Sequence, residues 1–247
     1  MFGIQGKAKL ASDLQESLMR AAAGDRLSSS KNVQHKDGWG GVWLSGEEQK
    51  YYRTTRPIFE DQSARNFFDL KSVTIWGLSH ARAAAKGEPI RNPLDSHPFA
   101  VHCGEDLLYI THNGHIAKER ISSSLGIDPL HLNDTEVFAL LVANMEGDVQ
   151  TRLERATRAV SESGGDQGGL NLLALRVSHD GTTDIRFYSD FPDSDKELYY
   201  SLYVARFENG AAVMSSTVAL EAGLIGAHGE VLNPNLEKVP LRQWYKL

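Results

Sequence analysis

The sequence predicts an α+β fold in which two antiparallel sheets pack between layers of helices, a four-layer αββα sandwich. Patterns typical of β-hairpins dominate the chain. The two strongest helical patterns follow one another between residues 134 and 163 instead of alternating with strands, as they would in a doubly wound parallel sheet. After Ser163-Gly164-Gly165 the apolar residues recur with period two. No repeat or low-complexity linker interrupts the 247 residues, so we expect one domain over 1–247.

The first half of the chain is expected to hold one helix and several strands. An apolar run at residues 2–4 precedes an amphipathic helix that ends near Gly24. Ser12 and Gln15 form a capping-box pattern at its start. Strands are expected over 39–44, 49–55, 72–79, 99–102 and 107–111.

The second half begins with the pair of helices. Asp134 is expected to be the N-cap of the first helix, which should end near Gly147. Apolar residues from Val149 to Val160 recur at spacings of four, three and four, which predicts a second helix with one apolar stripe. Strands are then expected over 170–177, 184–188, 198–207 and 212–216.

Composition excludes several classes of protein. The 26 Lys and Arg residues against 32 Asp and Glu give a formal net charge of -6, and no basic run is present, so nucleic acid is not expected as a partner. The longest apolar stretch, 137–143, is far shorter than the roughly 20 residues of a membrane helix. The single cysteine excludes an internal disulfide, which fits the cytoplasm, where we expect this protein.

Four polar clusters lie in Gly-rich or strand-end segments, where functional residues tend to occur. They are His35-Lys36-Asp37-Gly38-Trp39-Gly40, His80-Ala81-Arg82-Ala83-Ala84-Ala85-Lys86-Gly87 with the later Ser96-His97-Pro98-Phe99, Thr111-His112-Asn113-Gly114-His115, and Asn133-Asp134-Thr135-Glu136. Taken singly, each has an ordinary structural explanation. Asp37-Gly38 and Asn113-Gly114 are typical turn sequences, and Asp134 is a typical helix cap.

Taken together and in this order, the clusters resemble the class II glutamine amidotransferase domain, one of the N-terminal-nucleophile hydrolases. The stand-alone subgroup of that family has the signatures Asp-Gly-Trp-Gly, His-x-Arg-x-Ala, His-Pro-Phe, His-Asn-Gly and Asp-Thr-Glu. All five occur here at similar spacing, at 37–40, 80–84, 97–99, 112–114 and 134–136. The resemblance implies an αββα sandwich that hydrolyses the side-chain amide of glutamine, or of a related γ-glutamyl compound, through a thioester on an amino-terminal cysteine.

The resemblance also implies roles for four residues. Arg82 would bind the α-carboxylate of the substrate and Asp134 its α-amino group. Because a guanidinium grips a carboxylate with two parallel hydrogen bonds, and a buried zwitterion needs such partners to replace its hydration, these residue types suit an amino-acid substrate. The side chain of Asn113 and the backbone N–H of Gly114 would form the oxyanion hole.

Three further residues are expected to support this site. Asp37 and His97 should hold nearby loops, and Trp39 should fill the core more than it walls the pocket. One residue departs from the family: Ala85 stands where the family commonly has a threonine that assists the substrate carboxylate. The affinity and the choice of substrate are therefore open.

The nucleophile is expected to precede Met1. Phe2-Gly3-Ile4 resembles the end of the family's opening Cys-Arg-x-Phe-Gly, which puts the cysteine two positions before Met1, with its own α-amine as the general base. We favour a native opening Met-Cys-Arg-Met-Phe-Gly. The alternative is a diverged, non-catalytic glutamine-binding or scaffold module that retains the pocket without the nucleophile. Cys103 is expected in a hairpin turn, where it has no base to activate it.

A metal-dependent hydrolase is a less favoured alternative. His97, His102, Cys103, His112 and His115 lie within nineteen residues, but the His-x2-His pair across Asn-Gly is outside the usual zinc spacings. No metal or cofactor is expected, because a thiol, an amine and an oxyanion hole suffice for amide hydrolysis. The expected partner is a small-molecule substrate. The fate of the ammonia is left open. Either a separate synthase subunit accepts it, or the protein is a plain hydrolase.

Overall fold

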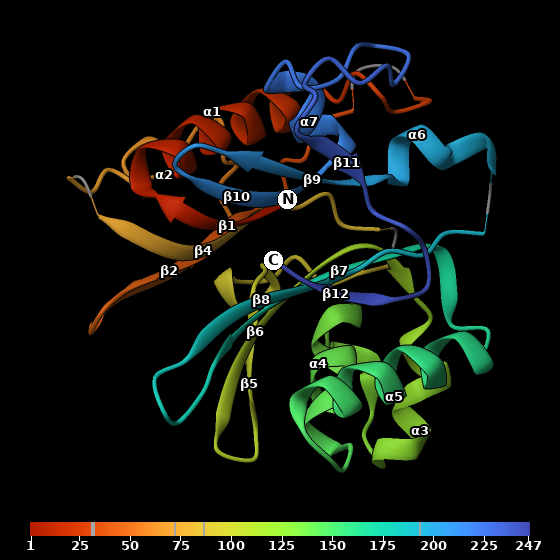
Figure 1. The fold of residues 1–247 in the computed structure, drawn as a ribbon. Helices are drawn as coiled ribbons and strands as arrows, with labels where there is room; N and C mark the ends of the chain where they lie inside the picture. The colour runs from red at the N-terminus through yellow and green to blue at the C-terminus, as the bar shows by residue number, and fades with distance from the viewer. Residues whose placement is uncertain (31–32, 72, 86, 193) are drawn as a thin grey trace.

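The computed structural model describes residues 1–30, 33–71, 73–85, 87–192 and 194–247, and in them two antiparallel sheets lie face to face between helices (Figure 1). The predicted αββα sandwich is therefore confirmed. Helices α1, Ala8–Ala23, and α7, Ser216–Glu221, cover the outer face of one sheet. Helices α3, α4 and α5 cover the outer face of the other sheet (Figure 1); their bounds are Lys118–Leu125, Asp134–Asn144 and Val149–Glu162.

The larger sheet has seven strands in the order β11-β9-β10-β1-β4-β2-β3. Its strands, in chain order, are β1 (Phe2–Lys7), β2 (Trp39–Ser45), β3 (Glu48–Thr54), β4 (Thr74–Ala81), β9 (Leu202–Phe207), β10 (Gly210–Ser215) and β11 (Leu236–Lys238). The first strand is central: β1 pairs with β4 on one side and with β10 on the other.

The smaller sheet has five strands in the order β12-β8-β7-β6-β5. These strands are β5 (Phe99–Cys103), β6 (Asp106–Ile116), β7 (Asp166–Val177), β8 (Thr183–Tyr188) and β12 (Trp244–Lys246). Two short helices complete the regular structure, α2 at Gln62–Arg65 and α6 at Glu197–Tyr200. Single 3-10 turns occur at Pro93–Asp95, Pro129–His131 and Ser194–Lys196.

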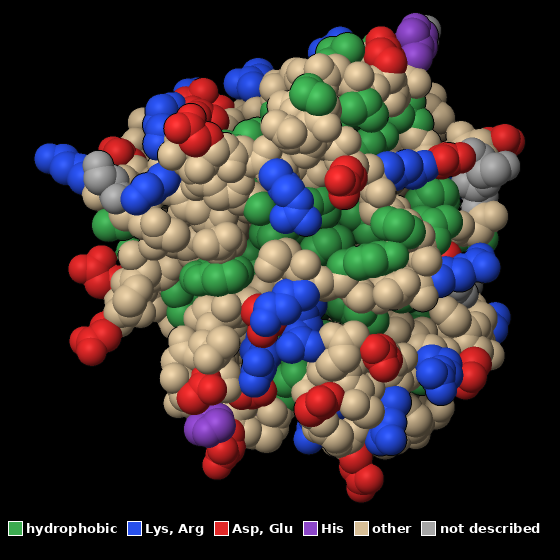
Figure 2. Space-filling model, viewed as in Figure 1, with side chains coloured by type: hydrophobic (Ala, Val, Ile, Leu, Met, Phe, Trp, Pro, Cys, Tyr) green, Lys and Arg blue, Asp and Glu red, His purple; other side chains and the backbone are tan. Residues whose placement is uncertain are grey.

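Three apolar cores follow from the alternation of side chains along the strands. One lies between the seven-stranded sheet and α1 with α7, and a second lies between the five-stranded sheet and α3 to α5. The third lies between the two sheets, where Leu78 and Val213 of one sheet pack in the same cluster as Leu173 and Ile185 of the other. Figure 2 shows hydrophobic side chains gathered along the seam between the sheets on the face in view. None of the described helices is long and apolar enough to span a membrane.

Two predicted helix starts were wrong. The first helix begins at Ala8, directly after β1, so Ser12 lies inside it and donates its hydroxyl to the carbonyl of Phe68 at 3.0 Å. The apolar stripe extends back to the buried Ala8 and outweighs the capping motif. In α4 the N-cap is Asn133, not Asp134, which is the first helical residue; Glu136 completes the capping box.

Other elements were missed or misassigned. The strand expected from residue 198 is interrupted, because 197–200 form α6 and β9 begins only at Leu202. The predictions contained no element for α2, α3, α7, β11 or β12. These elements have between 3 and 8 residues, too few for a periodic pattern to identify them.

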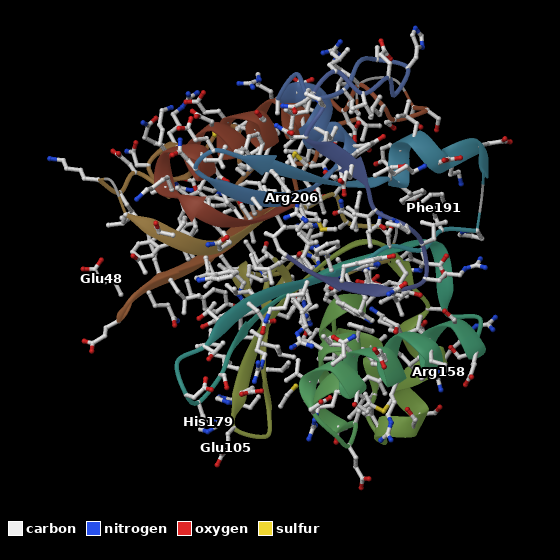
Figure 3. The ribbon with its side chains drawn as sticks, in the orientation of Figure 1. Glu48, Glu105, Arg158, His179, Phe191 and Arg206 are labelled. Atoms are coloured by element: carbon white, nitrogen blue, oxygen red, sulfur yellow. The ribbon has the colours of Figure 1, made fainter. Side chains whose placement is uncertain are left out.

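Three cations surround one buried carboxylate in the five-stranded sheet. The carboxylate of Asp184, fully buried on β8, lies 3.3 Å from Arg176, 2.9 Å from Arg186 and 3.4 Å from Lys246. Burial by itself raises the pKa of Asp184, but the hydrogen bond and charge of Arg186 and the other two cations lower it overall. At the tips of two neighbouring hairpins, His179 lies 3.7 Å from Glu105 (Figure 3).

Replacement of Asp184 tests this cluster. Asp184→Asn should lower the free energy of unfolding at pH 7 by about 3 kcal/mol, because three cations lose their shared anion. The folded-state pKa lies below the unfolded value of 3.8, so the stabilisation is present above that pH and is lost as the pH falls through the folded pKa. Urea unfolding at pH 7 and pH 3 should show the difference shrinking at pH 3. Glu237→Gln, on the exposed edge of β11, is the control; equal stability of the two variants at pH 7 would contradict the cluster's role.

Candidate active site

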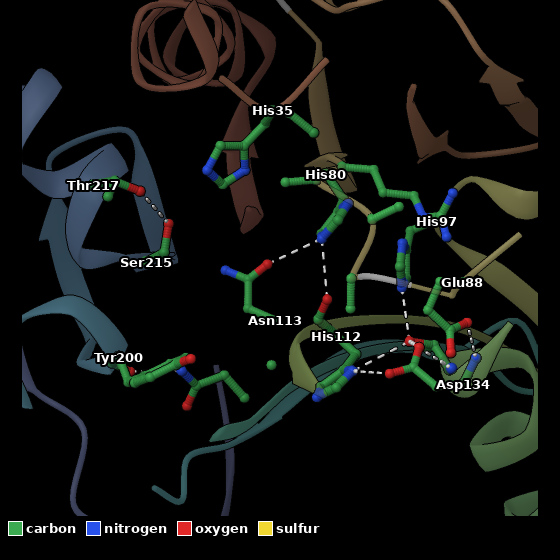
Figure 4. A pocket seen from close by; sticks show the side chains of 18 of the residues that line it. His35, His80, Glu88, His97, His112, Asn113, Asp134, Tyr200, Ser215 and Thr217 are labelled. Atoms are coloured by element: carbon green, nitrogen blue, oxygen red, sulfur yellow. Dashed lines mark hydrogen bonds and ion pairs between the residues drawn. The ribbon is translucent and has the colours of Figure 1, made fainter. Parts of the chain in front are cut away.

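A cavity of about 150 Å³ is lined by residues of both sheets and by the start of α4 (Figure 4). Five of the site residues expected from sequence line it: Arg82, His97, Asn113, Gly114 and Asp134. They come from the end of β4, the segment before β5, the end of β6 and the first turn of α4. The fold therefore brings together residues that lie up to 52 positions apart in the chain.

Arg82 follows β4 directly and is only 3% exposed. Its Nη1 donates to the carbonyl of Pro89 at 2.8 Å, whereas its Nη2 is buried and has no hydrogen-bond partner among the described residues. Burial lowers the pKa of Arg82, and the nearby carboxylates of Asp95, Asp134 and others oppose that change. A buried, unpaired guanidinium donor is unfavourable by itself, so the site favours an added acceptor.

Asp134 presents an ionised carboxylate at the amino-terminal end of α4. Its Oδ2 accepts the backbone N–H of Ile116 at 3.0 Å and lies 3.5 Å from Nδ1 of His115, and its Oδ1 accepts the N–H of Thr135 at 2.6 Å. Burial raises the pKa of Asp134, but the His115 hydrogen bond, the charge of His112 and the Ile116 N–H outweigh it and bring the pKa to about 2. The positive end of the helix dipole favours the same charge.

Asn113 and Gly114 lie where the pairing of β6 with β7 becomes irregular. Gly114 has φ +139°, and a Cβ at this position would lie 1.8 Å from the carbonyl oxygen of Gly169. Only glycine fits such a close backbone approach. The Oδ1 of Asn113 is 3.0 Å from Nε2 of His80.

The histidines near the cavity make mainly structural contacts. Nε2 of His97 lies 2.8 Å from the hydroxyl of Thr135, which Nδ1 of His112 also approaches at 3.2 Å. The His97 ring lies 4.1 Å, centroid to centroid, from the ring of His80. His97 therefore buttresses the first turn of α4, next to Asp134.

The cluster considered for a metal does not converge. Among the residues that the structure describes, no three His, Cys, Asp or Glu side chains are arranged to hold a metal ion. His102 is exposed on β5, whereas Cys103 is buried at the end of the same strand. Burial raises the pKa of the Cys103 thiol to about 11, so very little thiolate is present at neutral pH.

Asp37 and Trp39 lie outside the cavity lining. Asp37 accepts the N–H of Ala84 at 2.9 Å, and backbone hydrogen bonds join residues 37 and 38 to Arg82, so this segment holds the backbone at residues 82 and 84. Trp39 is fully buried between the seven-stranded sheet and its helices, where its Nε1 donates to Asp61 at 2.9 Å.

Several lining residues were missed by sequence reasoning. Glu88 is one; its Oε1 pairs with Lys118 at 3.1 Å and its Oε2 accepts the N–H of Asp134 at 3.1 Å. His35 also lines the cavity and lies 2.9 Å from the buried Asp25. The sequence does offer a signal for His35, because it begins the polar cluster at residues 35–40. No sequence pattern distinguishes Glu88 or Asp25 from ordinary solvent-exposed charges. Tyr200, Ser215 and Thr217 line the opposite end of the cavity from Glu88 and Asp134 (Figure 4), and Tyr199 and Asn171 also line the cavity.

The amino group of Met1 lies beside this end of the cavity. It donates to the hydroxyl of Ser215 at 3.2 Å. Burial lowers the pKa of this amine to about 5, although the carboxylate of Asp25 acts in the opposite direction. The start of β1 is therefore in a dry environment next to the cavity.

The fold is an αββα sandwich with a cavity lined by both a buried guanidinium and an ionised carboxylate. The chain belongs to the class II glutamine amidotransferases: the family model described as "Glutamine amidotransferases class-II" matches residues 10–187. A search of curated proteins found no significant match.

Replacement of Gly114 tests the close approach at the end of β6. Gly114→Ala should lower the free energy of unfolding by about 3 kcal/mol, because the new Cβ overlaps the Gly169 carbonyl and φ is positive. Gly104→Ala is the matched control: φ there is +67°, but nothing lies within 4 Å of the added Cβ, so about 1 kcal/mol is expected. Denaturant unfolding measures both, and equal losses would contradict the steric argument.

Proposed function

We propose that this domain hydrolyses the side-chain amide of glutamine, or of a related γ-glutamyl amide, through a thioester on a cysteine that precedes Met1. One observation carries the proposal. The same cavity is lined by a guanidinium with an unpartnered buried Nη2, at Arg82, and by an ionised carboxylate, at Asp134. This pair complements the α-carboxylate and α-ammonium of an amino acid, whose hydration must be replaced when it leaves water.

The arrangement of the cavity supports one orientation of the substrate. Figure 4 places Glu88 and Asp134 at one side, Ser215 and Thr217 at the other, and Asn113 between them. With its α-groups at Arg82 and Asp134, a glutamine would extend its side chain towards Asn113. The γ-carbonyl oxygen would then meet the amide of Asn113 and the N–H of Gly114, which the family resemblance assigns to the oxyanion hole.

The register of β1 supports the position of the nucleophile. Phe2 pairs with Ser79 of β4 and with Met214 of β10, antiparallel on both sides. Because β10 ends at Ser215 and α7 begins at Ser216, only the register with β4 can continue; a residue two positions before Met1 would then lie opposite Arg82, which lines the cavity.

Side-chain direction supports the same position. The sulfur of Met1 lies 3.6 Å from the hydroxyl of Thr111 on β6, so the Met1 side chain faces the five-stranded sheet. Because side chains alternate along a strand, a residue two positions earlier shares that face, just as Asn113 shares the face of Thr111. A cysteine at that position would face the proposed oxyanion donors.

The chemistry follows from these groups. The α-amine takes the thiol proton, and the thiolate attacks the γ-carbonyl carbon. Asn113 and Gly114 donate to the resulting oxyanion, each such donor contributing about 3 kcal/mol in known examples. Collapse of the tetrahedral intermediate breaks the C–N bond. The protonated α-amine of the cysteine gives its proton to the departing nitrogen, which leaves as ammonia. Water then attacks the thioester, which releases glutamate and restores the thiol. The ammonia is released to solvent or to a separate synthase subunit.

The substrate-binding role of Arg82 can be tested by affinity. Arg82→Ala should weaken glutamine binding by about 2 to 5 kcal/mol, because the substrate carboxylate loses its buried partner. Isothermal titration calorimetry measures the dissociation constants. Arg158→Ala, exposed on α5 (Figure 3) and outside the cavity lining, should bind glutamine like the wild type. Unchanged affinity in Arg82→Ala would remove Arg82 from the site.

The nucleophile can be tested by extending the chain. Protein whose first residue is a cysteine two positions before Met1 should release ammonia from glutamine, and an alanine there should reduce the rate at least about 1000-fold. Cys103→Ser should retain full activity, because its buried thiol lies outside the cavity lining. Turnover by protein that starts at Met1 would refute this assignment. Tight glutamine binding without turnover in the cysteine form would favour the non-catalytic alternative.

A further inference from the structure

His80, near the end of β4, joins the two sheets beside the cavity. Its Nε2 lies 3.0 Å from the backbone carbonyl oxygen of His112 and 3.0 Å from Oδ1 of Asn113, both on β6 (Figure 4). The side chain is 4% exposed. His80 thus links the seven-stranded sheet directly to the Asn113 amide.

These contacts fix the tautomer of His80. Both partners of Nε2 are oxygen atoms that can only accept, so Nε2 must carry a hydrogen. Nδ1 is buried and has no hydrogen-bond partner among the described residues. Burial lowers the pKa of His80 well below its usual value; the charges of the Met1 amine, His35 and His112 act in the same direction, and the hydrogen bond to Asn113 opposes them. The ring is therefore neutral with Nδ1 bare.

The tautomer in turn fixes the orientation of the Asn113 amide. Oδ1 accepts the His80 N–H, so the NH₂ group points the opposite way, into the cavity (Figure 4). No described residue accepts a hydrogen bond from that NH₂ group. A rotation of the amide by 180° would place its NH₂ group, a donor, against the N–H of His80, and would present an oxygen where the oxyanion is to be stabilised.

We propose that His80 is a positioning residue that holds the Asn113 amide with its NH₂ group towards the substrate oxyanion. The inference rests on the proposed function, because it assigns how one of the proposed oxyanion donors is oriented. His80 itself does not exchange a proton with the substrate. Its effect on the rate passes entirely through Asn113.

A double-mutant cycle tests this dependence, using the active enzyme with glutamine. His80→Leu should lower kcat about 100- to 1000-fold, like Asn113→Ala, with little change in KM because Arg82 and Asp134 remain. His80→Gln, which keeps an amide N–H donor, should recover part of the loss. The double variant His80→Leu/Asn113→Ala should be no slower than Asn113→Ala alone. Losses that multiply would show an independent role for His80 and overturn the proposal.

A spectroscopic arm separates this inference from the proposed function. In protein labelled with ¹⁵N-histidine, the two ring nitrogens of His80, assigned with His80→Gln, should show a protonated Nε2 and a bare Nδ1 between pH 5 and pH 8. His97 and His112 face the same region and are identified by their own variants. A protonated Nδ1 with a bare Nε2 would overturn the inference even if glutamine is hydrolysed. Failure of the wild type to hydrolyse any γ-glutamyl amide, with the expected tautomer present, would instead refute the function.

Discussion

The alternation of side chains on two facing sheets determines both the core and the site. On β4, Leu78 packs between the sheets and His80 lies on the same face, and Arg82 follows directly after the strand. On β6, Tyr109 packs in the same core, Thr111 contacts Met1 and Asn113 lines the cavity. The same period of two therefore continues from an apolar interior into a polar cavity. A one-residue shift of either strand would turn the site residues to the opposite face.

Burial then decides which polar groups the site tolerates. Glu88 is paired with Lys118, and Asp134 accepts two backbone N–H groups and lies near His115. Each of these charges is compensated within the protein. Arg82 is the exception, because one end of its guanidinium is buried without a partner. An acceptor supplied by a ligand would remove this cost, which is why the charge at residue 82 supports binding more directly than the charge at residue 134.

The sequence was sufficient to predict the fold class and many of the residues that line the cavity, but not the contacts between those residues. Hairpins such as β2–β3 and β7–β8 are visible because both strands and the turn are local. The pairing of β1 with β10 joins segments more than 200 residues apart, and no local pattern encodes it. Glu88 is similar: its pairing with Lys118 and Asp134 depends on how a loop folds over α4. His80 was visible as part of a motif, but its bond to Asn113 exists only once the sheets are stacked.

The central place of β1 gives the start of the chain a fixed position. An edge strand is hydrogen-bonded on one side and frays at its end, whereas β1 is held by β4 on one side and by β10 on the other. Because β10 ends at Ser215 and α7 begins at Ser216, a residue that continues this strand before Met1 would be guided by the register with β4. A catalytic group placed there would need no long side chain or mobile loop to reach the cavity, because the backbone itself would deliver it. Precision at such a site comes from the sheet, because groups carried by strands are positioned more exactly than groups carried by loops.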